Sequence, residues 1–147
     1  MRLLPGVPSQ ITLGFPATIR LDPTLNTIFI SKSTVIEGPG ADQLEISGQD
    51  QMRLFRIQNS QGVACDVAFR GVAVTHGYSQ SQAAGFLIAS SSSPAVNVTF
   101  ERSLLADHRS DDGGNAGAVF FCVGPAGITA RNCTFTRNVS AGYGAIL

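Results

Sequence analysis

The sequence lacks tryptophan, has one lysine (Lys32), and has charged residues at only 14% of its 147 positions. An average soluble domain carries about 25% charged residues. A nucleic-acid groove or a polybasic membrane patch needs clustered positive charge, but here 10 Lys and Arg residues are balanced by 10 Asp and Glu residues. We therefore expect no nucleic-acid partner.

Long hydrophobic runs are also missing. The most apolar uncharged stretch, Ala116 to Ala130, is too short and too interrupted by Gly and Pro to span a bilayer, so we expect no membrane span in this chain. The start of the chain, Met1 to Pro8, has one positive residue but no continuous apolar segment of about 7–15 residues. The sequence therefore predicts no signal peptide here.

Cysteine is scarce as well. The three cysteines, Cys65, Cys122 and Cys133, do not have the spacing of metal ligands. A disulfide between Cys122 and Cys133 would require Cα atoms within about 7 Å, which the sequence leaves open. We expect reduced, mostly buried thiols that pack as small hydrophobic side chains.

Glycine and short β-rich runs are abundant. Glycine occupies 16 positions, and no long stretch shows a 3.6-residue periodicity. Short runs of strand-forming residues are separated by Gly, Pro, Asn, Ser and Asp, which predicts an all-β fold. The predicted strands are Gln10–Leu13, Thr18–Leu21, Thr27–Ile30, Thr34–Glu37, Gln43–Ser47, Arg53–Gln58, Val63–Phe69, Gly71–Thr75, Phe86–Ala89, Ala95–Phe100, Ala118–Val123, Ile128–Ala130 and Cys133–Thr136.

Two motifs recur along the second half of the chain. Copies of the first motif, at offsets of 31 and then 30 residues, are Val67–Gly77, Val98–His108 and Ile128–Asn138. Copies of the second motif are Ala84–Ile88, Ala116–Phe120 and Tyr143–Leu147. Two motifs that repeat in the same order at a similar period indicate a solenoid.

A repeat of this length made only of short strands predicts a right-handed parallel β-helix, in which each coil takes roughly 20–31 residues. A leucine-rich or ankyrin array would need a helical segment in each unit, and none is visible. We expect one β-helix domain over residues 10–147, after a disordered or irregular segment 1–9, and a chain that is truncated inside a repeat. A sandwich with antiparallel strands is the alternative fold.

In a β-helix, equivalent residues of neighbouring coils stack in parallel ladders. The alignment predicts one outward ladder of alternating charge, which avoids like-charge repulsion, formed by Arg70, Glu101 and Arg131. It predicts three inward ladders, formed by Val67, Val98 and Ile128, by Phe69, Phe100 and Ala130, and by Val74, Leu105 and Phe135.

Glycines and turn residues recur at fixed places in the repeat. We expect a positive φ or a close backbone approach at the glycines that precede a strand, namely Gly85, Gly117 and Gly144. The exit turn of the first motif holds Gly77, His108 and Asn138 in its three copies. We expect left-handed backbone there and a hydrogen bond from the Asn138 side chain to the next coil, a role that suits His108 less well.

At these residues the sequence resembles right-handed parallel β-helix repeat proteins of bacterial cell surfaces, including polymorphic outer-membrane-protein repeats, which share a pectin lyase-like fold. Phe135–Asn138 matches their Phe-x-x-Asn element, whereas Gly142–Ile146 departs from their Gly-Gly-Ala-Ile element by the inserted Tyr143. The stretch Val35–Gly48 follows the strand, Gly-Pro-Gly-Ala turn, strand pattern of their opening coils. The resemblance covers nearly the whole chain from about Gln10.

The resemblance implies a secreted, cell-surface or outer-membrane location and a longer parent protein, but the family is functionally mixed. We expect a non-enzymatic structural segment that serves as an adhesin or scaffold and contacts polysaccharide or host-surface ligands. The alternative is a carbohydrate-active fragment similar to a polysaccharide lyase or glycoside hydrolase. Apolar residues on the edge of the last coil, Gly144–Leu147, predict end-to-end self-association.

The densest group of chemically capable residues is the stretch 107–115. Asp107, Asp111 and Asp112 are candidate calcium ligands. Together with His108 they are also the candidate catalytic residues for acid–base work on a glycosidic bond. Because Asp, Gly and Asn between strands are ordinary turn residues and no calcium-binding repeat is present, we expect a turn that binds neither a metal nor a cofactor.

Two lateral columns of the alignment contain further polar groups. Neither of them stacks two carboxylates, and their members are Asp66, Asn97 and Gly127 in one and His76, Asp107 and Arg137 in the other. We expect the second column to be a solvated ion-pair ladder, and both His76 and His108 to be surface-turn histidines.

Overall fold

The computed structural model describes residues 14–59, 63–90, 95–111, 113, 117–142 and 144. These residues form short strands and turns without a helix, and hence without a helix that could cross a membrane. Some features expected from the sequence lie outside the described residues, namely the irregular segment 1–9, the strand Gln10–Leu13, the candidate ligand Asp112 and, except for Gly144, the last copy of the second motif and the apolar edge at 143–147.

The strands follow one another in coils. The first coil contains β1 (Ala17–Arg20), β2 (Ile28–Ile30) and β3 (Thr34–Glu37), and the second contains β4 (Leu44–Ser47), β5 (Phe55–Gln58) and β6 (Cys65–Arg70). The third contains β7 (Ala73–Thr75), β8 (Tyr78–Ser79), β9 (Phe86–Ala89) and β10 (Val96–Glu101). The fourth contains β11 (Leu104–Ala106), β12 (Arg109–Ser110), β13 (Phe120–Val123) and β14 (Ala126–Arg131), and β15 (Thr134–Thr136) and β16 (Val139–Ser140) continue beyond it.

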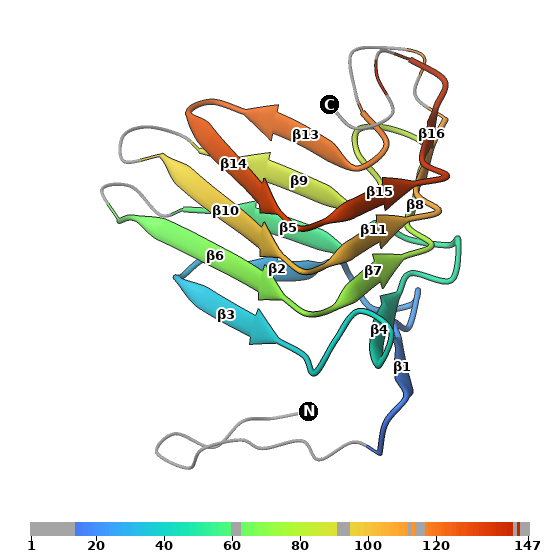
Figure 1. Ribbon diagram of the computed structural model, residues 1–147. Coiled ribbons are helices and arrows are strands. Elements are labelled where there is room, and N and C mark those ends of the chain that lie inside the picture. The colour runs from blue at the N-terminus through green and yellow to red at the C-terminus, as the bar shows by residue number, and fades with distance from the viewer. Residues whose placement is uncertain are drawn as a thin grey trace.

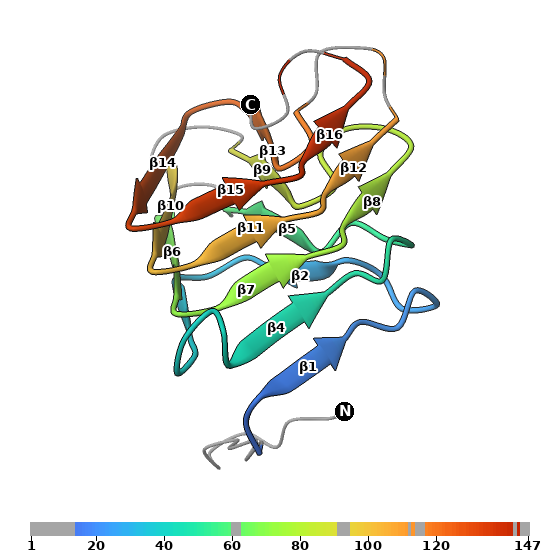
Figure 2. The ribbon, with the colours of Figure 1, turned by 45° about the vertical axis from the view of Figure 1, so that its right-hand side comes forward.

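Equivalent strands of successive coils form four parallel sheets. Sheet A has the order β1-β4-β7-β11-β15, sheet B β2-β5-β9-β13, sheet C β3-β6-β10-β14 and sheet D β8-β12-β16. In Figure 1 the chain runs from left to right along the front and returns along the back as it climbs, which makes the solenoid right-handed. Figure 2 shows the strands of sheet A stacked from β1 at the bottom to β15.

The pairing confirms the β-helix and excludes the antiparallel sandwich for the described residues, because the strand pairs are parallel. Val98 pairs with Val67 and Ile128, and Leu105 pairs with Val74 and Phe135. The predicted register of the first motif is therefore correct in all its copies.

The core lies inside the coils and contains two facing columns of phenylalanine. One column rises through sheet B and the other through sheet C, and together they comprise Phe55, Phe86 and Phe120, and Phe69 and Phe100. These rings are at most 2% exposed, and neighbouring ring centroids lie 4.9–5.6 Å apart. Phe55 stacks on Phe86, and Phe69 stacks on Phe100, while rings of the two columns meet edge to face, and both are arrangements that aromatic quadrupoles favour. Phe120 is tilted against both Phe86 and Phe100.

The inward ladders are less buried at the last coil. Val67, Val98 and Phe100 are at most 1% exposed, whereas Ile128 is half-buried and Ala130 is exposed. The reason is that β14 has a paired strand on one side only within the described residues.

The second motif has a different register from the one predicted. Phe86 pairs with Phe120, not with Ala118, so the offset from β9 to β13 is two residues longer than the sequence alignment assumed. A slip of two residues keeps every side chain on its predicted face, because the side chains of a strand alternate with period 2. The motif therefore identified the strand and its buried face, but gave the wrong partners.

Four strands were not among the predicted runs, namely β8, β11, β12 and β16. Three of them form sheet D and are two residues long, such as Tyr78–Ser79 and Arg109–Ser110. Their hydrogen bonds run between coils, from Arg109 N to Gly77 O for example, so no local sequence pattern marks them.

Left-handed backbone marks the corners of the coils, one residue earlier than predicted for the exit turn. His76, Asp107 and Arg137 have φ between 53° and 58°, while Gly77, His108 and Asn138 follow them. The corner between sheets C and A is left-handed too, at Gly71, Arg102 and Asn132.

All three cysteines are free thiols, as expected. Cys65 is buried in the core, where burial raises the pKa of its thiol. Cys133 is half-buried and Cys122 is exposed, so the expectation that the thiols are mostly buried is wrong for Cys122.

Candidate functional site

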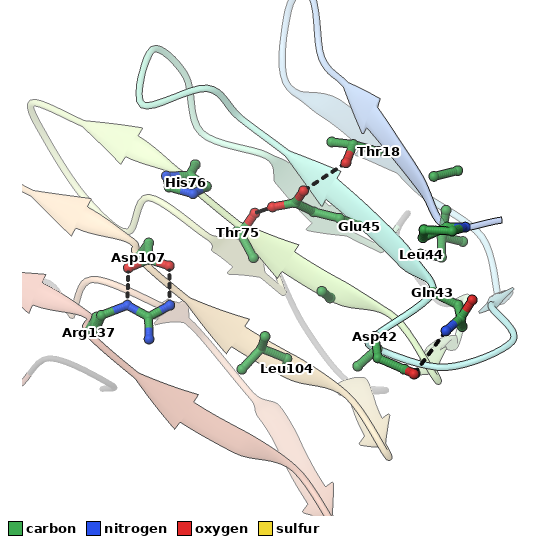
Figure 3. Close-up of a pocket in the computed structure, with 14 residues that line it drawn as sticks. Thr18, Asp42, Gln43, Leu44, Glu45, Thr75, His76, Leu104, Asp107 and Arg137 are labelled. Carbon is green, nitrogen blue, oxygen red and sulfur yellow. Dashed lines mark hydrogen bonds and ion pairs between the residues drawn. The ribbon is translucent and has the colours of Figure 1, made fainter.

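A groove of about 430 Å³ runs across the outer face of sheet A (Figure 3). Thr18, Glu45, Ala73 and Leu104 occupy equivalent outward positions on β1, β4, β7 and β11, because alternate residues of each strand face the core. The turns that leave these strands add His76, Asp107 and Arg137 to the lining.

Glu45 is held at the centre of this face by hydroxyl groups of the two neighbouring coils. Thr18 Oγ1 donates to Glu45 Oε2 at 2.9 Å, and Thr75 Oγ1 donates to Glu45 Oε1. Both carboxylate oxygens therefore accept a hydrogen bond from within the stack.

Asp107 forms a bidentate ion pair with Arg137 on the next coil. Arg137 Nε and a terminal guanidinium nitrogen lie 2.6 Å and 2.7 Å from the two carboxylate oxygens (Figure 3). The hydrogen bonds from Arg137, assisted by its charge, lower the pKa of Asp107. Asp107 is therefore an anion at neutral pH and is oriented by its partner.

The same column continues toward the first coil with His76, whose Nδ1 lies 3.2 Å from the carboxylate of Asp50. The column of His76, Asp107 and Arg137 thus lies along one corner of the solenoid as expected, with an ion pair between Asp107 and Arg137 and with His76 in contact with Asp50. A face of paired charges and hydroxyl groups can exchange hydrogen bonds with a polar ligand such as a sugar, whose hydroxyls both donate and accept.

His108 does not belong to this surface. Its side chain is fully buried, so the expectation of a surface-turn histidine is wrong. The backbone N–H of Gly77 donates to His108 Nδ1 at 3.1 Å, which places the proton of the neutral ring on Nε2. Burial lowers the pKa of His108 to about 4, with the carbonyl of Val74 and the charge of Asp107 acting in the opposite direction.

Two glycines make room for this imidazole. A Cβ on Gly77 would lie 2.6 Å from His108 Nδ1, and one on Gly85 would lie 3.4 Å from His108 Nε2 and 2.7 Å from the carbonyl oxygen of Val119. Gly85 therefore serves a close approach of backbone and ring. His108 Nε2 has no hydrogen-bond partner among the described residues.

The other described candidate ligands of the 107–115 stretch, Asp111 and Asp107, each pair with a different arginine. Asp111 accepts hydrogen bonds from Arg109 Nε at 2.7 Å and from the Tyr78 hydroxyl at 3.0 Å, and the Arg109 interaction lowers the pKa of Asp111. Asp107 instead pairs with Arg137, one coil further on. Within the described residues, no three His, Cys, Asp or Glu side chains gather as ligands for a metal ion.

Asn138 links two neighbouring coils by hydrogen bonds, as expected, and its partners lie on the preceding coil. Its Oδ1 accepts from the backbone N–H of His108, and its Nδ2 donates to the carbonyl of Leu105, both at 3.0 Å. Phe135 packs against the core, with its ring 6.1 Å from that of Phe120. Of the predicted structural glycines, Gly117 is buried and Gly144 has a φ of 64°.

Sheet C presents a second groove, of about 440 Å³, over its outer face. Asn97 Nδ2 donates to Asp66 Oδ1 at 2.9 Å, and Arg70 Nε lies 3.1 Å from Glu101 Oε2. Both contacts join residues that the repeat alignment placed in one column. The outward charge ladder is therefore confirmed in register and in its first ion pair.

The sequence reading missed Glu45 and its two threonines. The repeat alignment began at Val67, and the spacing of the earlier coils is shorter: Ala17 pairs with Leu44, and Ile46 pairs with Val74. The outward position of Glu45 between Leu44 and Ile46 was the signal that could have placed it on this face.

Comparison of the chain with models of known protein families, with curated proteins and with solved structures gave no match in any of the three. The parallel β-solenoid therefore stands on the structure itself.

Proposed function

We propose that this chain is a structural, non-enzymatic β-helix segment of a bacterial surface or secreted protein. It would act as a scaffold or adhesin that presents the outer faces of sheets A and C to polysaccharide or host-surface ligands. In this proposal the chain is akin to polymorphic outer-membrane-protein repeats.

Two residues of the Phe-x-x-Asn element support that likeness. Phe135 points to the core and Asn138 bonds to the coil below, so both serve the stacking of one repeat on the next. An element with this role is expected in proteins selected for long stacks of coils.

The proposal rests on one observation: the acidic side chains Glu45 and Asp107 on the sheet A face are hydrogen-bonded or ion-paired to other residues of the protein. Glu45 accepts hydrogen bonds from Thr18 and Thr75, and Asp107 forms a bidentate ion pair with Arg137. Glycoside hydrolysis needs one carboxyl that gives up a proton and another that attacks or activates water. An aspartate whose pKa is lowered by a bidentate guanidinium is a poor proton donor at neutral pH, which favours a binding face over a catalytic one.

The test is to incubate the protein with a panel of acidic and neutral polysaccharides. Binding is followed by retention on immobilised polysaccharide and on host cells, and turnover is followed by the appearance of unsaturated products and new reducing ends. We expect retention without turnover. Arg137→Ala should weaken retention if the sheet A groove is used, whereas Arg56→Ala, on the exposed face of β5, is the matched control.

Turnover that rises with protein concentration and is lost in Asp107→Asn would replace the proposal with the carbohydrate-active alternative. Failure to bind any polysaccharide or host cell would refute the adhesive role.

A further inference from the structure

The outer face of sheet C carries its charges in an order that is its own complement. β6 and β10 form the centre of this face and are each paired on both sides, with β3 and β14 next to them (Figure 1). The side chains at the last position of these strands point outward and, from β3 to β14, are Glu37, Arg70, Glu101 and Arg131. The column reads negative, positive, negative, positive from one side and has every sign reversed from the other.

The two central strands hold their outward polar groups in place. Arg70 Nε lies 3.1 Å from Glu101 Oε2, and Asn97 Nδ2 donates to Asp66 Oδ1 at 2.9 Å. The side chains of Arg70 and Glu101 are still 38% and 29% exposed. Because a guanidinium has five N–H donors and a carboxylate has several acceptor sites, each of them can bond a second partner from outside.

Short side chains separate these two polar columns. The outward residues between them, from β3 to β14, are Val35, Ala68, Thr99 and Thr129. They form the floor of the groove over sheet C. Sheets that pack face to face lie about 10 Å apart, a gap that a long arginine or glutamate side chain can cross while the short floor residues do not clash.

We propose that sheet C is a dimer interface, in which it packs face to face against sheet C of a second copy. The two copies are related by a two-fold axis that runs along the strands and passes between β6 and β10. This axis reverses the order of the strands, so β6 lies opposite β10 of the second copy. Arg70 then faces Glu101, and Asp66 faces Asn97, and each contact occurs twice because the interface is isologous.

The outer strands obey the same rule, because the axis also sets β3 opposite β14 of the second copy. Glu37 then faces Arg131, and within the described residues neither of them has an ion-pair partner in its own copy. A two-fold axis along the solenoid would instead set the charged column over the column of Asp66 and Asn97, and would leave Glu37 and Arg131 without an opposite charge. Complementary charges therefore favour the axis along the strands.

The size of the face sets the strength of the dimer. Four strands of at most six residues cover about 400 Å² when measured flat. Standard interfaces bury roughly 800 Å² per partner, so we expect a weak dimer that dissociates on dilution. An isologous contact is closed, so association stops at two copies, and sheet A lies outside the contact.

Sedimentation velocity over a wide range of protein concentration tests the interface. The wild type should show a monomer–dimer equilibrium without larger species. Glu37→Arg and Arg131→Glu each place like charges at two symmetry-related positions. Each should therefore raise the dissociation constant roughly tenfold, and less so at high salt.

The double variant Glu37→Arg/Arg131→Glu separates this contact from a general effect of net charge. It has the net charge of the wild type, and it restores opposite charges across the two-fold axis. Its dissociation constant should therefore return toward that of the wild type, although each single change weakens the dimer.

Matched controls change the net charge equally away from sheet C. Asp22→Arg, in the exposed turn after β1, and Arg56→Glu, on the outer face of β5, should leave the dissociation constant unchanged. Circular dichroism checks that all variants keep the β-helix. The proposal is overturned by a wild type that stays monomeric at its highest soluble concentration, by single variants that dimerise like the wild type, or by a double variant that dimerises no better than the single ones.

Discussion

At the scale of single residues, the corner that follows sheet A shows how one side chain can join two coils. Asn138 accepts from His108 N and donates to Leu105 O. One coil earlier His108 stands in the equivalent position and accepts from Gly77 N. A histidine has thus taken an asparagine position, and it fits because Gly77 and Gly85 have no side chain there.

Asn138→Ala should destabilise the protein. The substitution leaves the N–H of His108 and the carbonyl of Leu105 without their partner, which costs about 1–3 kcal/mol of unfolding free energy. Urea denaturation followed by circular dichroism measures the loss. Asn97→Ala, on the exposed face of β10, is the control and should change stability by about 0.5 kcal/mol or less. Equal losses in the two variants would show that the bridge contributes nothing.

The buried imidazole of His108 predicts a loss of stability in mild acid. Its pKa is about 4 in the folded protein and about 6.5 in the unfolded chain. Between these values the unfolded state binds more protons, so stability falls as the pH is lowered from 6.5 to 4. The full effect is on the order of 3 kcal/mol.

His108→Asn should remove this slope, because asparagine does not titrate and restores the residue type found at Asn138. Urea midpoints measured at several pH values compare the variant with the wild type. The carboxylates of Asp107 and Asp111, whose pKa values are lowered, contribute a separate loss at lower pH. The same slope between pH 6.5 and 4 in both proteins would assign it to other groups.

At the scale of elements, short strands are stabilised by ladders of identical or similar side chains. β10 contributes Phe100, which contacts the rings of Phe69, Phe86 and Phe120. β6 and β10 share the same alternation of buried and less buried side chains, so each buried residue of β10 lies on a buried residue of the coil before, and β14 pairs with β10 in the same register. Aromatic stacking along the axis therefore ties elements that are about one repeat apart in sequence.

Phe100→Ala should be among the most destabilising substitutions. The ring is fully buried between two coils, and its removal leaves a cavity that costs about 3–5 kcal/mol. Phe29→Ala is the matched control, because Phe29 is 57% exposed on β2, and its loss should be below about 1 kcal/mol. Chemical denaturation of both variants gives the difference. Comparable losses would mean that the phenylalanine columns are not the core of the stack.

At the scale of the whole molecule, each coil is stabilised by the coils directly above and below it, because it contacts only these neighbours. The central strands of sheet C, β6 and β10, are paired on both sides, whereas β3 and β14 are edge strands of the described sheet.

Hydrogen exchange should therefore be slowest for backbone amides of β6, β7, β9 and β10 and faster for β1, β3, β14 and β15. Mass spectrometry of peptides from dilute protein measures the gradient. Uniform protection of all these strands would contradict a gradient set by pairing on one side or on both sides within the described sheets.

Much of this architecture could be predicted from the sequence, because the side chains that stack are also those that repeat. The first motif fixed the register of sheets A and C, from Val67 to Ile128 and from Val74 to Phe135. It did not reveal sheet D, whose two-residue strands depend on hydrogen bonds between coils. Nor did it align the second motif correctly, since the loop before β13 is longer than the one before β9.

The sequence by itself determined the β-helix, its low charge and the alternating ladder of Arg70, Glu101 and Arg131, because period-2 alternation and a repeat of about one coil are local properties of the chain. Only the tertiary structure decided the burial of His108, the bonding of Glu45 by Thr18 and Thr75, and the pairing of Asp107 with Arg137. These contacts join residues roughly 27–31 positions apart, and their geometry depends on the height and offset of neighbouring coils. No local pattern encodes that offset.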